Sequence, residues 1–246
     1  KLKLNKRLVL TLGCVAVLII LIGVFKIKYS DKLFVSKNAA SSMQDFEIDD
    51  MGKLKKYKGT SPNVVIPNNV KSIEKNAFML RDSLTSVTIP NSVTEIGEYA
   101  FWGCEDLESV KLSNKLRTIG KSAFSDCSSL TSIIIPDSVT EIGESVFWGC
   151  KGLVSVKLSN KLTKLGQNAF WECSSLKSIE FPPSLTVING GMFAHCTNLT
   201  SVTIPKNIVN IGVIAFYECP NLTIICPSGS YAQDFAIREK IKYKNK

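Results

Sequence analysis

The chain has 246 residues and is 45% hydrophobic, so it can bury one or two sizeable cores. Its formal net charge is +9, of which residues 1–33, with seven basic residues and one acidic residue, contribute +6. Residues 60–226 carry thirteen basic and fourteen acidic residues (−1), and residues 34–59 (+1) and 227–246 (+3) supply the remainder. Nucleic-acid-binding proteins concentrate positive charge on one folded face, and this charge distribution does not. We therefore expect no nucleic-acid partner.

Residues 8–25 form an uncharged apolar run, LVLTLGCVAVLIILIGVF, preceded by Lys1, Lys3, Lys6 and Arg7 and followed by Lys26 and Lys28. A helix of this length spans about 27 Å, close to the hydrocarbon thickness of a bilayer. The basic residues before the run favour a cytoplasmic N-terminus. We therefore predict that residues 1–29 are an uncleaved signal-anchor, a transmembrane helix that makes the membrane a partner and leaves the rest of the chain extracellular.

Two alternatives to the anchor remain open. A cleaved signal would give a secreted protein, but the run is long for a signal peptide and no convincing small-residue cleavage site follows it. Residues 11–14, TLGC, are similar to a lipoprotein cleavage box, although the apolar stretch before Cys14 is too short and Thr11 stands where Leu is usual. Residues 30–45 lack periodicity and are predicted to form a spacer.

Four columns of apolar residues then recur every 23 residues without a slip in register. They are Phe78, Phe101, Phe124, Phe147, Phe170, Phe193 and Phe216; Leu84, Leu107, Leu130, Leu153, Leu176, Leu199 and Leu222; Val87, Val110, Ile133, Val156, Ile179, Val202 and Ile225; and Ile73, Ile96, Ile119, Ile142, Leu165, Ile188 and Ile211. A fixed period of this length indicates a solenoid. A 46-residue period is superimposed, since residues 109–116 and 155–162 both read SVKLSNKL.

Each repeat contains a segment L-x-S-V-x-I that predicts a short strand. Its Val and Ile point to one side, whereas the Ser and the intervening residue point to the other. One strand cannot bury its apolar side alone, but copies stacked about 4.8 Å apart form a parallel sheet over a continuous core. Pro ends the strand because it lacks an N–H for the ladder, although Ser113 and Ser159 replace it in two repeats.

A glycine column follows the strand and predicts a turn that needs either a small residue or a left-handed backbone. Its members are Gly97, Gly120, Gly143, Gly166 and Gly212, and Asn189 takes the same position in one repeat. Asn tolerates positive φ better than most residues, so the substitution favours the left-handed interpretation. We expect the next Ala-Phe pair to close a short turn or 3-10 segment, with Phe at the centre of the coil.

The full consensus, C-x-x-L-x-S-V-x-I-P-x-S-V-x-x-I-G-x-x-A-F, closely resembles the BspA-like class of leucine-rich repeats over roughly residues 46–242. The resemblance implies a β-dominated leucine-rich-repeat solenoid of the horseshoe class over residues 46–246. It implies an N-terminal hairpin cap over residues 46–59, turning near Asp50, Met51 and Gly52, and a C-terminal helix-strand cap over residues 227–244. Members of the class are described as surface adhesins or binders of host matrix proteins, although fold alone does not carry function.

Six cysteines, Cys104, Cys127, Cys150, Cys173, Cys196 and Cys219, form one column at the repeat spacing. A disulfide ladder is one hypothesis, since neighbouring Cα atoms would lie within bridging range. However, stacked side chains point in the same direction rather than at each other, and no C-x-x-C pair suggests zinc. We favour buried free thiols that fill space and form weak hydrogen bonds to the neighbouring rung. We therefore expect no metal and no cofactor.

The only histidine, His195, occupies a variable turn position that we expect to be exposed. Its neighbour Cys196 is adjacent in sequence, and adjacent residues rarely align as nucleophile and base. No phosphate-binding, nucleophile-elbow or zinc-protease motif occurs, and the acidic residues are scattered. We therefore expect no catalytic residues and no enzyme activity.

Two surfaces remain as candidate binding sites. The first is the strand face, the side of the strands opposite the core, with Ser86, Thr88, Ser109, Lys111, Ser132, Ile134, Ser155, Lys157, Ser178, Glu180, Ser201 and Thr203. Solenoids present such surfaces to peptides or proteins, but Ser also suits any crowded, solvated sheet. The second is the aromatic edge, Trp102, Trp148, Trp171 and Tyr217, which either anchors a partner or packs over the next rung, the interpretation that we favour.

Taken together, these features predict a membrane-tethered extracellular binding module. Its expected partner is a protein or peptide, from a host surface or matrix, bound through the solenoid surface. The alternative function is a structural or assembly role at the cell surface without a host ligand.

Overall fold

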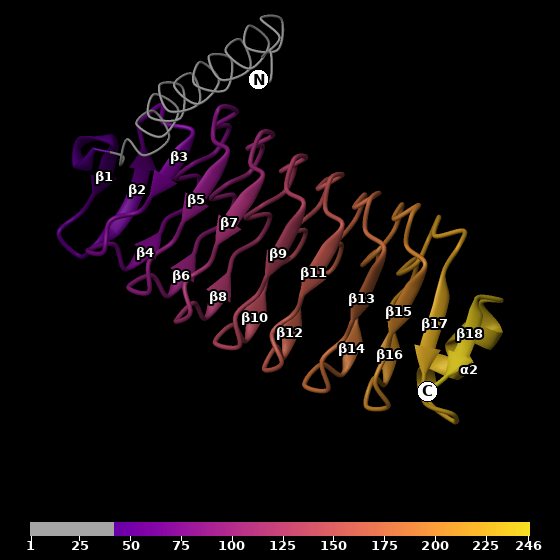
Figure 1. The fold of residues 1–246 in the computed structure, drawn as a ribbon. Coiled ribbons are helices and arrows are strands. Elements are labelled where there is room, and N and C mark those ends of the chain that lie inside the picture. Colours follow the sequence, from indigo (N-terminus) through magenta and orange to yellow (C-terminus); the bar gives the residue numbers. More distant parts are fainter. Residues whose placement is uncertain (1–41) are drawn as a thin grey trace, which may run out of the picture. The chain divides into compact units, whose positions relative to one another are not determined.

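The computed structural model of this protein describes residues 42–246. The predicted signal-anchor (1–29) and most of the predicted spacer (30–45) lie outside these residues. Within residues 42–246, no helix has both the length and the apolar composition needed to cross a bilayer. Residues 41–246 form one compact unit, a solenoid of about 23-residue repeats with parallel strands, which confirms the predicted repeat fold (Figure 1).

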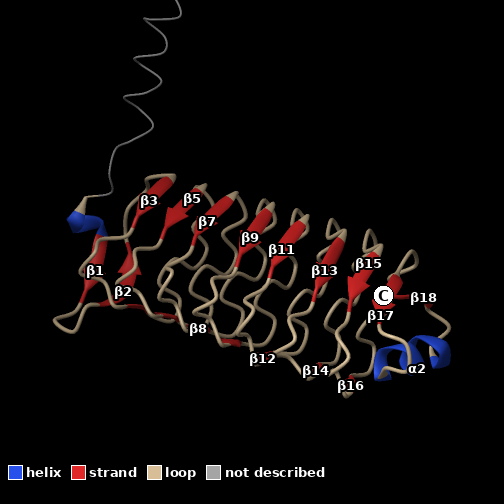
Figure 2. Cartoon of the chain, turned by 60° about the horizontal axis from the view of Figure 1, so that its bottom comes forward, coloured by secondary structure: helices blue, strands red, loops and turns tan. Residues whose placement is uncertain are grey.

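Each repeat forms one rung that contributes two strands to two rows. The long strands are β3 (Asn63–Val65), β5 (Ser86–Thr88), β7 (Ser109–Lys111), β9 (Ser132–Ile134), β11 (Ser155–Lys157), β13 (Ser178–Glu180), β15 (Ser201–Thr203) and β17 (Thr223–Cys226). The short strands are β4 (Ser72–Ile73), β6 (Glu95–Ile96), β8 (Thr118–Ile119), β10 (Glu141–Ile142), β12 (Lys164–Leu165), β14 (Val187–Ile188) and β16 (Asn210–Ile211). The two rows are joined by loops and turns (Figure 2).

A stack of phenylalanine rings fills the core between the rows. The rings of the Phe78 to Phe216 column lie nearly parallel, with neighbouring centroids 4.8–5.8 Å apart. All but Phe216, which is 8% exposed, are fully buried. Stacking of this kind adds to the hydrophobic gain from burying each ring. The prediction that Phe occupies the centre of the coil is therefore confirmed.

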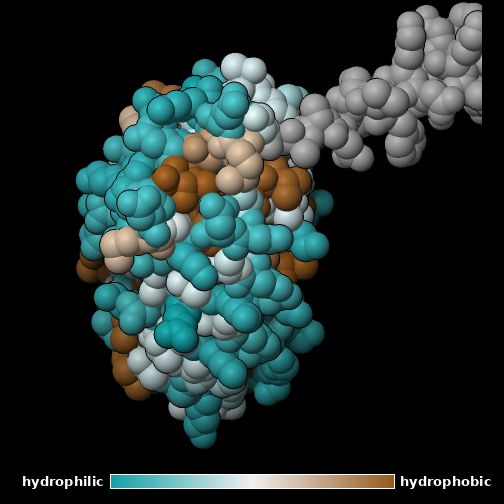
Figure 3. Space-filling model, turned by 90° about the vertical axis from the view of Figure 1, so that its left-hand side faces the viewer, coloured by the Kyte–Doolittle hydropathy of each residue, from teal (hydrophilic) through white to brown (hydrophobic). Residues whose placement is uncertain are grey.

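The N-terminal end is closed by a hairpin. The 3-10 helix η1 (Met43–Asp45) leads into β1 (Phe46–Ile48), which pairs antiparallel with β2 (Lys53–Tyr57), and β2 pairs with β4. The Asp49 carboxylate accepts hydrogen bonds from the backbone N–H groups of Met51 and Lys53, which fixes the turn. Tyr57 stacks on Phe78 at 5.1 Å and so covers the first phenylalanine ring. Hydrophilic side chains cover most of this end of the domain (Figure 3).

The C-terminal end is closed by helix α2 (Tyr231–Arg238) and strand β18 (Lys242–Asn245). The Ser230 hydroxyl caps the helix by accepting a hydrogen bond from the Gln233 N–H. Phe235 of α2 packs edge-on against Phe216, with ring centroids 6.1 Å apart, and β18 pairs in parallel with β17. The helix thus covers the last ring of the stack.

A turn segment of seven residues, such as 97–103, follows each short strand and is built of turns rather than of 3-10 helix. Each turn segment has positive φ at two positions four residues apart. The first set is Asn76, Tyr99, Ser122, Ser145, Asn168, Gly191 and Ile214; the second is Leu80, Gly103, Asp126, Gly149, Glu172, His195 and Glu218. In every turn segment but the last, the third, fifth and seventh residues donate backbone hydrogen bonds to carbonyl oxygens of the next rung.

The expectation of a left-handed backbone at the glycine column is wrong. Gly97, Gly120 and Gly143 do not have positive φ, and the left-handed positions lie two and six residues later. The glycines are required by close packing between rungs, because a Cβ at Gly143 would lie 2.7 Å from the backbone nitrogen of Lys121. Asn189 substitutes for glycine and donates a side-chain hydrogen bond to the Leu165 carbonyl oxygen at 2.6 Å.

Candidate binding surface

The strand face is formed by the outward side chains of β5 to β15. Parallel pairing in register aligns its serines in a row, with Ser86 opposite Ser109, and Ser132, Ser155, Ser178 and Ser201 opposite one another in turn. The outward residues of β7, β9, β11 and β13 are exposed, whereas those of β5 and β15 are half-buried. The exposed part of the strand face is therefore its middle.

The middle of the strand face combines basic and apolar character. Ile134 lies in register with Lys157, in the same column as Lys111, and its side chain is 66% exposed. Glu180 is the one acidic residue of this column among the described strands, and its Oε1 lies 3.7 Å from Nζ of Lys246. An exposed Ile beside two lysines gives this part of the face a positive potential and an apolar contact point.

The row of long strands is interrupted at two places, after β7 and after β11. These strands belong to the two repeats in which serine replaces proline. In other repeats the residue after the long strand donates to the next rung, as Ile135 N–H does to the Lys157 carbonyl at 2.9 Å. The equivalent N–H groups of Leu112 and Leu158 make no backbone hydrogen bond within residues 42–246. As a result, β11 and β13 pair only through Ser155 and Ser178, and Val110 and Val156 are only half-buried.

A cavity of about 360 Å³ opens where β11 and β13 separate. Its lining includes Lys157 and Glu180 from the strand face and Val156, Leu158 and Phe181 from the core side. The strand face thus has a recess with apolar walls next to Lys157. The sequence reasoning named Lys157 and Glu180 but missed the other lining residues, and the available signal was Ser159 in place of proline.

The buried serines explain how the chain accommodates the loss of proline. The Ser113 hydroxyl donates to the Val93 carbonyl oxygen at 2.7 Å and accepts from the Lys115 N–H, and Ser159 accepts from Lys161 in the same way. Both serines are fully buried. They stabilise the following loop instead of the strand ladder.

The aromatic edge is not one continuous surface. Trp102 is half-buried and its indole N–H donates to Asp126 at 3.0 Å, while Ser125 and Ala194 interrupt the column. The His195 ring fills the second interruption, with its centroid 5.2 Å from Trp171 and 5.5 Å from Tyr217. Packing over neighbouring rungs therefore accounts for Trp102 and Trp171, whereas Trp148 and Tyr217 are exposed.

His195 is half-buried rather than exposed as expected, because it packs between two aromatic rings. Its Nδ1 lies 2.8 Å from Oε2 of Glu218 in the next rung. Its sequence neighbour Cys196 is buried and donates to the Phe170 carbonyl oxygen. The two side chains are therefore committed to different partners and do not form a nucleophile–base pair.

The cysteine column consists of free thiols that bond to the preceding rung. Each Sγ of Cys104, Cys127, Cys150, Cys173, Cys196 and Cys219 donates to a phenylalanine carbonyl oxygen at 3.0–3.2 Å. Burial raises the pKa of the Cys104 thiol to about 12 and that of Cys219 to about 11. All seven cysteines of the described part of the chain are unpaired, as the favoured interpretation predicted. No group of three or more His, Cys, Asp or Glu side chains in this part could hold a metal ion.

Residues 56–173 and 122–233 match a family described as BspA type leucine-rich repeat region, in six copies. A crystal structure of a T. pallidum leucine-rich repeat protein is 31% identical, covers 84% of this chain and 98% of that one, and has a TM-score of 0.72. A leucine-rich cell surface protein from Faecalibacterium prausnitzii A2-165 is 24% identical over 76% of each chain, with a TM-score of 0.41. No match was found among curated proteins.

Proposed function

The chain belongs to the BspA-type leucine-rich repeat family, and we propose that its repeat domain is a binding module that recognises a protein or peptide through the middle of the strand face. The observation that carries the proposal is the exposed column Lys111, Ile134 and Lys157 beside the recess between β11 and β13. Basic side chains next to apolar contact points suit a partner segment that is acidic and partly apolar.

We also propose that residues 8–25 tether this module to the cell membrane and leave the repeat domain outside the cell. The support is the length of the uncharged run and the basic residues before it. The full chain should fractionate with membranes, and protease added to intact cells should digest the repeat domain. Recovery of the repeat domain from the culture medium with a new N-terminus would instead indicate a cleaved signal.

The binding proposal is tested with purified residues 41–246, the compact unit, and immobilised host matrix proteins. Replacing Lys111→Glu together with Lys157→Glu should weaken binding at least tenfold, because it reverses both charges of the exposed column. The matched control is Lys115→Glu with Lys161→Glu, which makes the same charge change in the same two repeats, but on exposed loop residues.

Equal binding by the two double variants would place the site elsewhere and contradict the proposal. Retention of no foreign protein, combined with self-association of residues 41–246 in sedimentation velocity, would favour the structural or assembly role instead.

A further inference from the structure

The last turn segment, residues 212–218, has no rung beyond it. In the segment before it, the N–H groups of Gly191, Phe193 and His195 donate to carbonyl oxygens of residues 213, 215 and 217 at 3.1, 2.8 and 2.8 Å. The equivalent N–H groups, those of Ile214, Phe216 and Glu218, have no partner among residues 42–246. Three backbone donors spaced two residues apart therefore line this edge, and a further rung would satisfy all of them.

The terminal rung is also apolar where the inner rungs are polar. Val213 is 82% exposed, and the earlier residues of its column are Lys75, Glu98, Lys121, Glu144, Gln167 and Gly190. Ile214 is 53% exposed with φ +50°, a conformation that β-branched residues rarely adopt, and Asn76 and Asn168 stand at the same position in inner rungs. Val209 is 64% exposed where Thr140, Thr163 and Thr186 stand in the preceding rungs. A solenoid end normally has a polar outer surface, so these apolar residues indicate a surface that becomes covered.

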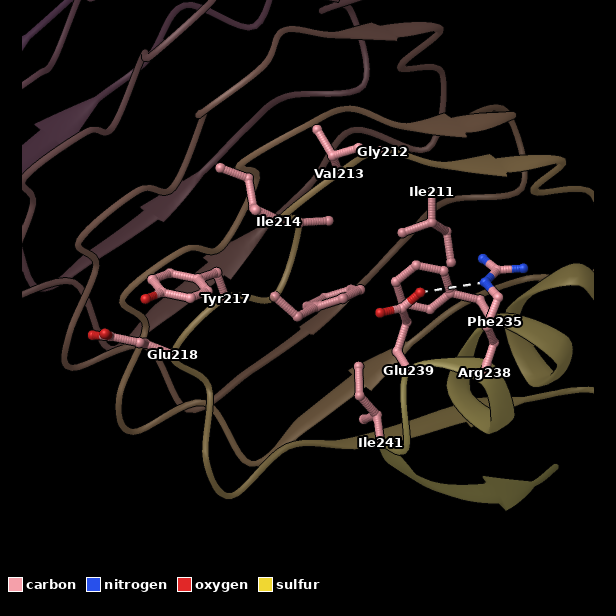
Figure 4. Close-up of a pocket in the computed structure, with 12 residues that line it drawn as sticks. Ile211, Gly212, Val213, Ile214, Tyr217, Glu218, Phe235, Arg238, Glu239 and Ile241 are labelled. Atoms are coloured by element: carbon pink, nitrogen blue, oxygen red, sulfur yellow. Dashed lines mark hydrogen bonds and ion pairs between the residues drawn. The ribbon is translucent and has the colours of Figure 1, made fainter.

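A cavity of about 560 Å³ lies between this open edge and helix α2. Figure 4 shows Ile214 and Tyr217 on one side of it and Phe235, Arg238 and Glu239 on the other. The volume lies within the range of about 300–1,000 Å³ that is usual for ligand pockets. We refer to this cavity and the open edge as the terminal groove.

The structure itself shows what kind of segment fits the three donors. On every inner rung the three donors are covered by the turn segment of the next rung, whose accepting carbonyl oxygens are spaced two residues apart. The same edge of a second copy cannot serve, because donors would face donors. Glu218 and Glu239 outnumber Arg238 in the lining, which disfavours an acidic segment. Phe235 already covers Phe216, so the residue placed over that ring must be small.

We propose that the terminal groove binds an apolar, non-acidic peptide segment of a partner protein, which takes up the conformation of an inner turn segment and so adds to the solenoid as one further rung. Its backbone carbonyl oxygens accept hydrogen bonds from Ile214, Phe216 and Glu218, and its apolar side chains cover Val213, Ile214 and Tyr217. This site is separate from the strand face, and its binding is independent of the partner bound there.

The test uses the peptide acetyl-INGGMAAH-amide, which copies residues 188–195 with alanine in place of Phe193. Binding of the fluorescently labelled peptide to residues 41–246 is followed by anisotropy, and backbone protection by hydrogen–deuterium exchange. The peptide should bind and should slow exchange at residues 214, 216 and 218 at least tenfold. The double variant Val213→Lys with Ile214→Asn should weaken binding at least tenfold without lowering Tm, because the same Lys-Asn pair stands at residues 75 and 76.

The matched control is Gln167→Lys, which creates the same pair next to Asn168 on an inner, covered rung and should leave binding unchanged. The proposal is overturned by any of three results: no binding of the peptide at millimolar concentration, equal binding by the double variant and the control, or protection on β7 to β13 in place of the terminal segment. Loss of matrix-protein binding by the Lys111→Glu and Lys157→Glu variant bears on the strand face alone, so the two proposals can fail separately.

Discussion

At the scale of single residues, the glycine column shows how closely neighbouring rungs approach. Gly143 lies against the backbone of Gly120 and Lys121, and its φ is one that any residue can adopt. A Cβ at this position must therefore push two rungs apart rather than strain its own backbone.

We predict that Gly143→Ala lowers the free energy of unfolding by about 1–3 kcal/mol, the usual cost of overpacking. The control is Gly190→Ala, since its new Cβ would meet nothing closer than the Val213 carbonyl oxygen at 3.3 Å. That change should be neutral or slightly stabilising because alanine restricts the unfolded chain. Urea denaturation of both variants measures the difference, and equal losses would show that close rung packing is not the cause.

The cysteine column makes the domain sensitive to alkaline pH. Burial raises the pKa of the Cys150 thiol well above its ordinary value of 9.0. Because the pKa of the thiol is higher in the folded state, its contribution to stability is fully present below about pH 9, the ordinary pKa of a thiol in the unfolded chain. This contribution is lost as the pH rises from there toward the folded-state pKa. The loss is about 1.4 kcal/mol per pH unit for each thiol.

Cys150→Ala should therefore cost about 1–2 kcal/mol at pH 7, from the lost hydrogen bond and a small cavity. At pH 10.5 the difference from the parent protein should shrink by about 2 kcal/mol, because the variant has one fewer buried thiol to ionise on unfolding. Ser125→Ala is the control, since its buried hydroxyl donates to the Ser145 carbonyl oxygen but does not titrate in this range. A pH-independent cost for both variants would contradict the prediction.

At the scale of elements, the sequence predicted the strands and nearly all of the core columns, because apolar periodicity depends directly on burial. The exception is the last long strand, β17, where the register shifts by one residue and Ile224, not the predicted Ile225, lies buried opposite Val202. The sequence also did not predict the interruption after β7 and β11. Ser113 and Ser159 were recognised as replacements for proline, but a proline-free position is compatible with either a continued or a broken ladder. Both serine hydroxyls accept a hydrogen bond from the N–H group two residues later, and Ser113 also donates to the Val93 carbonyl oxygen, twenty residues away, which no local pattern encodes.

The candidate sites were predicted only in part for a similar reason. The strand face follows from the two-residue alternation, so its residues could be named. The recess between β11 and β13 and the terminal groove arise where a regular pattern stops, and their lining comes from residues that look like ordinary core or turn positions. Positive φ at residues as different as Tyr99, Glu172 and Ile214 likewise has no common sequence signal, because it recurs with position in the turn segment rather than with residue type.

Helix α2 protects the end of the phenylalanine stack, and its contribution should be local. Phe235→Ala removes the ring that covers Phe216 and should cost about 3 kcal/mol or less, since the site is at the edge of the domain. In a solenoid each rung contacts only its neighbours, so amide exchange should accelerate over β15 to β18 and stay unchanged over β5 to β9. Uniform acceleration across all strands would show instead that the domain opens only as a whole.

At the scale of the whole molecule, the 46-residue period allows rungs to be removed without disturbing the remainder. Deletion of residues 124–169 removes 46 residues and joins Ala123 to Phe170, which restores the Ala-Phe pair and every column. We expect this variant to fold with the same type of circular-dichroism spectrum and a lower Tm, because it loses two rung interfaces. Deletion of residues 124–167 removes two fewer residues, shifts every later column, and should abolish the cooperative melting transition.

The one-way direction of hydrogen bonds between the turn segments has an electrostatic consequence. In each rung three peptide N–H groups point toward the C-terminal end of the solenoid, and their acceptors point back. Peptide dipoles aligned head to tail add together, as they do along an α-helix. In a helix the partial positive charge gathers at the N-terminus, whereas here it gathers at the C-terminal edge, over Ile214, Phe216 and Glu218. The row of turn segments thus ends in a positive pole made of backbone amides rather than of any basic side chain, whereas hydrogen bonds beside the strands, such as those from Thr94 to Lys71 and from Gly97 to Ile73, run in the opposite direction.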